Sequence, residues 1–208
     1  MRLLKKHRAA LSLYFFYSCG LLFIALGFKE VLELTPILLL STFGLVLLKF
    51  KSISIKLLVA LAVVFVCTFT VEAIGVNTGY VFGEYTYLSN LGTQWLNTPL
   101  LIGINWILLT ISAHHITAKT LKLPHSLQLV CAALLMVCWD LVIEPLAPAL
   151  KFWSFDTGFG LHNSIGWFML SLVSLWLWRK LSPRKENHLA VHVLLSQLLF
   201  FIPLYLIL

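Results

Sequence analysis

Residues 71–92, VEAIGVNTGYVFGEYTYLSNLG, interrupt a very apolar part of the chain with glycines, aromatic residues and carboxylates. Apolar runs long enough to span a bilayer lie on both sides, so the stretch predicts a loop between two membrane helices. A connection between helices needs only a few polar residues, and a longer loop of this composition suggests a binding role. The alternative is a re-entrant or interfacial loop with aromatic anchors.

The composition around this stretch indicates a multi-pass membrane protein. The 208 residues are 60% hydrophobic and 11% charged, with a mean hydropathy of +0.95, far from the balance of a soluble domain. The net charge is +7, but the basic residues fall in short clusters between apolar runs, which indicates membrane topology and not nucleic-acid binding. All four cysteines lie in apolar segments, so we expect neither a disulfide framework nor a zinc site.

The apolar pattern predicts an all-α fold, a polytopic transmembrane bundle of about seven helices in one integral-membrane domain over residues 1–208. No small-residue cleavage site follows the first apolar run, so we expect an uncleaved first helix. The predicted spans cover about residues 9–27, 33–50, 53–74, 96–116, 126–144, 164–181 and 188–208.

Charge predicts the orientation of these spans. All lysines and arginines except Lys29 and Lys151 fall at one end of the predicted bundle. The positive-inside rule then puts the N-terminus in the cytoplasm and the C-terminus outside, in the plasma (inner) membrane. Of the acidic residues, Glu186 falls inside, and those at the outer end are Glu30, Glu33, Glu72, Glu84, Asp140, Glu144 and Asp156.

Three of these carboxylates fall at membrane depth. Asp140 and Glu144 are four residues apart in CWDLVIEPLAP and share a helix face, and Pro145 predicts the helix end. Glu72 falls in the last turn of the predicted span 53–74. Such groups usually face a bundle interior or a wet cavity, although interfacial acids hydrated by water are the alternative. When several carboxyls lie together with no cation nearby, the protonated form of at least one of them is favoured. General acid catalysis requires such a protonated carboxyl.

Aromatic residues crowd the same predicted end. An interfacial belt is the ordinary explanation. The alternative is that their faces stabilise a carbocation formed beside the acids. These residues are Tyr80, Phe82, Tyr85, Tyr87 and Trp95 in the first outer loop, and Phe152, Trp153, Phe155, Phe159 and Trp167 around the second.

Three other kinds of site are disfavoured. The predicted cytoplasmic histidines contain one HxxxH spacing, too few for a membrane di-iron site, so we expect no metal. The Asp140 to Glu144 spacing is similar to a magnesium-diphosphate motif, but it falls on the outer side without a second acidic motif or basic residues. The last predicted helix has no lysine for a retinal Schiff base. The histidines in question are His114, His115, His188 and His192.

Four motifs together resemble a known family. Residues 72–85 read E-x-x-G-x-x-T-G-x-x-F-G-x-Y, Pro99 and Trp106 follow, residues 140–145 read D-x-x-x-E-P, and residues 163–167 read N-x-x-G-W. Over about residues 55–180 the chain resembles the integral-membrane carotenoid biosynthesis family of bisanhydrobacterioruberin hydratase and carotenoid 1,2-hydratase type. Where that family often has W-x-W, this chain has Trp153-Ser154-Phe155.

The resemblance implies cofactor-free, acid-catalysed hydration of the terminal C1=C2 bond of an acyclic carotenoid end group, such as that of lycopene or γ-carotene. The expected partners are a carotenoid, water and the lipid bilayer, and no nucleic acid. Depth and neighbours favour Asp140 as proton donor tuned by Glu72, with Glu144 or Glu84 positioning water. The expected substrate-binding residues are Tyr80, Tyr85, Trp95, Trp153, Asn163 and Trp167.

Two alternatives to a hydratase stay open. A membrane lycopene-type cyclase also protonates a terminal double bond but closes a ring instead of admitting water. A non-catalytic carotenoid-binding protein, or a transporter with an acidic proton relay, predicts that replacing Asp140 or Glu72 leaves the pigments unchanged.

Overall fold

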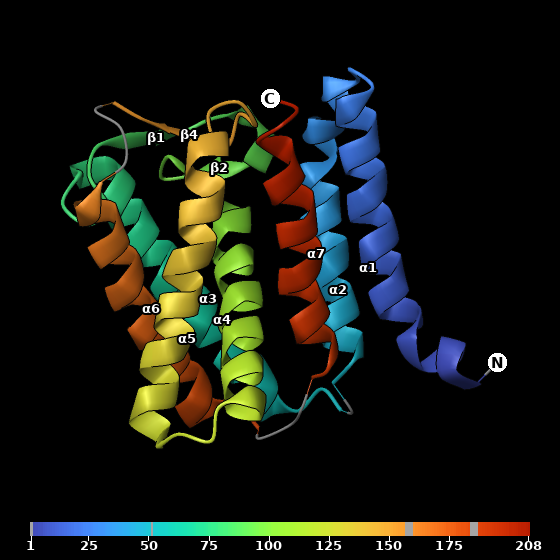
Figure 1. Cartoon of the computed structure of the whole chain (residues 1–208). Helices are drawn as coiled ribbons and strands as arrows, with labels where there is room; N and C mark the ends of the chain where they lie inside the picture. The colour runs from blue at the N-terminus through green and yellow to red at the C-terminus, as the bar shows by residue number, and fades with distance from the viewer. Residues whose placement is uncertain (1, 51, 157–159, 184–186) are drawn as a thin grey trace.

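A computed structural model describes residues 2–50, 52–156, 160–183 and 187–208. Lys51, Phe159, Arg184, Lys185 and Glu186, which the sequence predictions used, lie outside these ranges. Within them seven α-helices run alternately up and down, so the two ends of the chain lie at opposite ends of the bundle (Figure 1). They are α1 Arg2–Ala25, α2 Thr35–Leu48, α3 Ile55–Thr78, α4 Leu100–Thr120, α5 His125–Ile143, α6 Leu161–Leu181 and α7 Leu189–Leu204.

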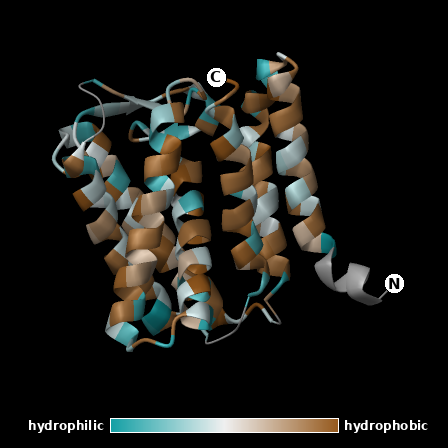
Figure 2. Cartoon of the chain, viewed as in Figure 1, coloured by the Kyte–Doolittle hydropathy of each residue, from teal (hydrophilic) through white to brown (hydrophobic). Residues whose placement is uncertain are grey.

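The described helices confirm the predicted all-α membrane bundle. Among the described residues, five segments are long and apolar enough to cross a membrane: Arg8–Ala25, Lys29–Leu48, Ile55–Thr78, Leu100–Thr120 and His125–Leu146. Hydrophobic residues cover the middle of the bundle and hydrophilic ones gather towards its ends (Figure 2). Helix α7 has only 16 residues, fewer than the predicted span 188–208.

Helix α3 extends further than the sequence predicts. Ser54 caps its start by accepting a hydrogen bond from the Leu57 N–H at 3.3 Å. Instead of ending near residue 74, the helix continues to Thr78 and stops at Gly79, which has a left-handed φ of 71°. The first part of the polar stretch 71–92 is therefore helical, and its glycine at residue 79 is the helix stop.

Helix α4 begins later than predicted because a small hairpin precedes it. Strands β2 Gln94–Trp95 and β3 Thr98–Pro99 pair antiparallel. The two residues between them, Leu96 and Asn97, both have positive φ, at 52° and 57°, as a type I′ turn requires. The helix can start only after this turn, at Leu100.

A second two-stranded ribbon joins the two long loops at one end of the bundle. Strand β1, Tyr85–Tyr87, pairs antiparallel with β4, Trp153–Phe155, so that Tyr87 lies opposite Trp153 (Figure 1). Short 3-10 helices complete this end: η1 Lys29–Leu34, η2 Ser89–Leu91 and η3 Glu144–Leu146. As Pro145 predicted, α5 ends at Ile143, immediately before η3.

Candidate active site

Glu72 is the centre of a buried hydrogen-bond network between α3, α4 and β1. Its side chain belongs to a membrane-spanning segment and is only 3% exposed, so the protein itself surrounds it. The hydroxyls of Tyr85 and Tyr87 donate to Oε2 at 2.8 and 2.7 Å, and the indole N–H of Trp106 donates to Oε1 at 2.7 Å. Both carboxyl oxygens are thus held by donors that come from two other elements.

The strand geometry explains why two tyrosines reach the same oxygen. Side chains alternate between the two faces of a strand, so Tyr85 and Tyr87 point to one face and Thr86 to the other. Tyr85 and Tyr87 also contact each other edge to face, with ring centroids 5.3 Å apart. Strand β1 therefore closes over the end of α3 with two hydroxyls directed at Glu72.

Asp140 on α5 and Glu144 on η3 form a pair of neighbouring carboxyls, which is the second acidic part of the site. Asp140 is fully buried and Glu144 is 3% exposed. The amide of Asn163, on α6, donates to Asp140 Oδ2 at 3.0 Å, and the indole N–H of Trp153, on β4, donates to Glu144 Oε1 at 3.0 Å. Each carboxyl therefore has one oxygen fixed by a neighbouring element.

Asp140 and Glu144 are four residues apart, so their carboxyls lie close enough to act electrostatically on each other. Two buried carboxylates repel each other and have only acceptor atoms, so the pair is most favourable when one of the two carboxyls carries a proton. The remaining oxygens, Asp140 Oδ1 and Glu144 Oε2, have no protein donor among the described residues. Glu72 lies close enough to act electrostatically on both carboxyls. The arrangement can hold a transferable proton and leaves an oxygen free for water.

A cavity of about 280 Å³, here called the acid pocket, lies between Glu72 and the pair formed by Asp140 and Glu144. Glu144 and Asn163 form part of its wall, and Asp140 lies behind them. The lining contains no lysine or arginine among the residues that the structure describes. The acid pocket is lined by Glu72, Phe82, Tyr85, Tyr87, Ile102, Glu144, Trp153, Phe155, Asn163 and Trp167.

Tryptophans connect the two halves of the site. Trp106, which donates to Glu72, stacks on Trp167 with ring centroids 4.3 Å apart. Trp167 lines the acid pocket and also contacts Trp139, at a centroid distance of 6.3 Å. Aromatic faces beside carboxyls suit a positive charge on carbon, because the face of an aromatic ring carries negative potential.

The two tyrosines on β1 stay protonated donors. Burial is the main cause that raises the pKa of Tyr85 and of Tyr87 above the ordinary tyrosine value, and the negative charge of Glu72 raises both further. Their hydroxyls therefore keep donating to Glu72 at any pH near neutrality.

The structure brings together seven of the ten residues that the sequence proposed for the site. Glu72, Tyr85, Glu144, Trp153, Asn163 and Trp167 line the acid pocket, and Asp140 accepts a hydrogen bond from Asn163. The remaining three lie elsewhere: Tyr80 is 83% exposed, Glu84 is exposed, and Trp95 is 61% exposed and stacks on Phe69. They belong to the turn after α3 and to the β2–β3 hairpin, which direct their side chains away from the pocket.

Two donors to Glu72 were absent from the predicted site residues. Trp106 stands inside an apolar helix and Tyr87 within a general aromatic crowd. The alternation in Tyr85-Thr86-Tyr87 and Trp153-Ser154-Phe155 was the available signal, because period-two alternation of aromatic residues indicates strands. Among the described residues, no group of three or more His, Cys, Asp or Glu is arranged to hold a metal ion.

Comparison with known proteins gives two matches. Residues 34–208 match a family model described as carotenoid biosynthesis protein, a region longer than the motif-bearing residues 55–180. The chain is 27% identical over 132 residues to bisanhydrobacterioruberin hydratase from Haloarcula japonica. That similarity covers 57% of this chain and 43% of the relative, so the chain spans less than half the length of this curated protein. No solved structure matches the chain.

Proposed function

This chain belongs to the carotenoid biosynthesis protein family, and we propose that it adds water to the terminal C1=C2 double bond of an acyclic carotenoid end group. The product is a tertiary alcohol, and lycopene or γ-carotene are the substrates to test first. The observation that carries the proposal is the buried pair of carboxyls, Asp140 and Glu144, at the wall of an aromatic pocket. The name of the relative from Haloarcula japonica, a hydratase, supports the same reaction class.

The first step is proton transfer to carbon. The carboxyl pair holds one transferable proton, which Asp140 passes to Glu144 and which Glu144, in the pocket wall, gives to C2. The two electrons of the double bond form the new C–H bond, so C1 becomes a tertiary cation. The rings of Trp153 and Trp167 lie beside this position, and Glu72 opposes the positive charge from the other wall.

The second step is attack by water on C1. A water bound at the free oxygens of Asp140 and Glu144 forms the C–O bond and returns one proton to the carboxyl pair. The pair regains its starting protonation, and the reaction consumes only water. No cofactor takes part in this scheme.

The membrane setting supports the same chemistry. A long polyene dissolves in the bilayer, and only its end has to reach the carboxyls. We propose that the protein lies in the plasma (inner) membrane. The positive-inside rule favours a cytoplasmic N-terminus, which puts the acid pocket near the outer face.

The decisive experiment is expression in a host that accumulates lycopene, followed by separation and mass spectrometry of the pigments. We expect new, more polar pigments heavier by one water or two. Asp140→Asn and Glu144→Gln keep the side-chain shapes but remove the shared proton, and both are expected to abolish the products. Products of unchanged mass would mean cyclisation. Unchanged pigments, also in a second host that makes γ-carotene, would refute catalysis and favour a binding protein.

A further inference from the structure

Three cavities that share lining residues lie one after another between the acid pocket and the side of the bundle. The acid pocket shares Ile102 and Trp153 with an inner cavity of about 550 Å³. The inner cavity shares Thr35, Leu38 and Phe200 with a groove of about 1020 Å³. Because single side chains belong to two walls at once, each cavity directly adjoins the next.

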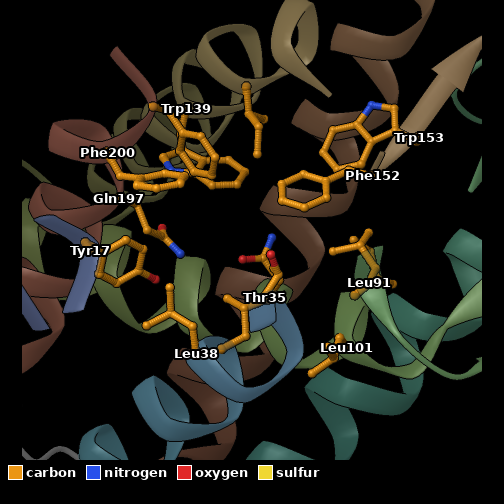
Figure 3. Close-up of a pocket in the computed structure, with 15 residues that line it drawn as sticks. Tyr17, Thr35, Leu38, Leu91, Leu101, Trp139, Phe152, Trp153, Gln197 and Phe200 are labelled. Carbon is orange, nitrogen blue, oxygen red and sulfur yellow. The ribbon is translucent and has the colours of Figure 1, made fainter. Parts of the chain in front are cut away.

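The inner cavity is mainly apolar and aromatic. Trp139 and Phe200 lie on one side of it, and Phe152 and Trp153 lie on the other (Figure 3). Walls that are apolar and aromatic with a few polar groups are typical of sites for small hydrophobic molecules. Trp153 therefore faces two spaces, one with the carboxyls and one with hydrocarbon character.

Tyr17 and Gln197 add polar groups to the wall of the inner cavity. The hydroxyl of Tyr17 lies near the side chains of Gln197 and Thr42. Both side chains are almost fully buried, and both turn their polar ends towards the open centre (Figure 3). These polar groups lie at one side of a cavity whose other walls are apolar.

The groove opens towards lipid and not towards water. It is formed by α1, the segment η1–α2, and Phe200 of α7, which lie side by side (Figure 1). Phe16, Phe23 and Ile37 line it and are each about half exposed or more, on segments apolar enough to cross the membrane. From Phe16 to Ile24 it follows α1 for about 12 Å, so it suits an extended chain.

We infer that the groove and the inner cavity are a lateral access and binding track for a linear polyene taken from the bilayer, with its end delivered to the acid pocket. This inference rests on the proposed function for its substrate class. The groove receives the chain between α1 and α2, and the aromatic inner cavity holds the conjugated part next to the reacting end.

The natural cysteines offer a direct test without any substitution. Cys19 lines the groove, whereas Cys138 is exposed on α5, away from it. Lycopene in nanodiscs should slow N-ethylmaleimide labelling of Cys19 by about fivefold and leave Cys138 unchanged, as occupancy of a pocket predicts. The readout is peptide mass spectrometry. Equal labelling with and without lycopene, or equal protection by the saturated hydrocarbon squalane, would overturn the inference.

A second test blocks the junction between the groove and the inner cavity. Leu38 lines both, whereas Leu40 on the same helix is 50% exposed and outside the described linings. In an Asp140→Asn background, which stops turnover, Leu38→Trp should reduce copurified lycopene by about fivefold relative to Leu40→Trp. Equal pigment in the two variants would refute the track. If Leu38→Trp reduces lycopene binding while the chain without substitutions forms no hydrated product, the result supports the track and refutes only the proposed reaction.

Discussion

Gly166 of α6 and Phe82 of the loop after α3 are packed so closely that a Cβ at residue 166 would lie 2.7 Å from Cδ1 of the ring. The same Cβ would also overlap the carbonyl oxygen of Val81. On the other side of the ring, a Cβ at Gly75 would lie 2.6 Å from Cδ2. Two motif glycines thus hold Phe82 between α3 and α6, and Phe82 in turn contacts Tyr85 edge to face.

Replacing Gly166 by alanine should therefore destabilise the protein. The added methyl group meets backbone, which moves less easily than a side chain, so we expect a loss of about 1–3 kcal/mol in the free energy of unfolding. The midpoint of thermal unfolding in detergent measures this change. Gly160→Ala is the matched control, because nothing lies within 4 Å of its Cβ position and its φ of −151° suits any residue. Equal midpoints for the two variants would contradict the close packing.

Deleting one of the tyrosine hydroxyls that donate to Glu72 should lower the reaction rate more than it lowers the stability of the protein. Tyr87→Phe keeps the ring and deletes the 2.7 Å hydrogen bond, and Tyr85→Phe deletes the 2.8 Å bond to the same oxygen. We expect each to lower the rate of product formation by about tenfold, the effect of one lost buried hydrogen bond to a charged acceptor. Because both donate to Oε2, the double variant should deviate from the product of the single effects, and independent effects would contradict the shared acceptor.

The raised pKa values of Tyr85 and Tyr87 predict a loss of stability at alkaline pH. Both hydroxyls keep their protons more strongly in the folded than in the unfolded chain, whose ordinary tyrosine pKa is 10.0. Below that pH the two states bind the same protons. Above it the unfolded chain releases protons that the folded chain retains, so stability falls as pH rises. The stability lost between about pH 8 and about pH 11, measured by thermal unfolding, should be smaller in the Tyr85→Phe, Tyr87→Phe double variant than in the parent chain.

Much of the fold was predictable because membrane spans depend on length and apolarity, which are properties of the sequence itself. The helix ends were less predictable, because they depend on single residues whose φ is visible only in the structure. Gly79 stops α3 four residues beyond the predicted end, and the positive φ of Leu96 and Asn97 delays α4. Leucine rarely adopts that conformation, so no sequence rule marks this turn.

The carboxyls of the site were predictable for a similar reason. An acid at membrane depth is costly and needs a polar environment, which singled out Glu72, Asp140 and Glu144. Their donors were harder to identify because they come from distant segments: Trp106 is 34 residues from Glu72. Position within the motif does not decide which side chains line the pocket, since Glu84 and Tyr80 stand within the motif but are exposed.

Two tryptophans that the sequence predicts to bind the substrate, Trp153 and Trp95, should therefore differ in how much their replacement lowers activity. Trp153 donates to Glu144 and lines the acid pocket, whereas Trp95 is 61% exposed and stacks on Phe69. Trp153→Phe keeps an aromatic face but leaves Glu144 Oε1 without its indole donor, so we expect about a tenfold slower formation of hydrated pigment. Trp95→Phe keeps the stacking and should stay within about twofold of the parent rate, as surface substitutions usually do.

The comparison is made by pigment mass spectrometry at matched protein levels, with Glu84→Gln as a second control because that exposed carboxyl lies outside the pocket lining. Acetonitrile-extracted pigment per molecule of protein gives the ratio for each variant. A large loss in Trp95→Phe or Glu84→Gln would mean that the β2–β3 hairpin or the turn after α3 contacts the substrate. In that case the reacting end of the polyene would lie nearer the outer surface than the carboxyls of α5.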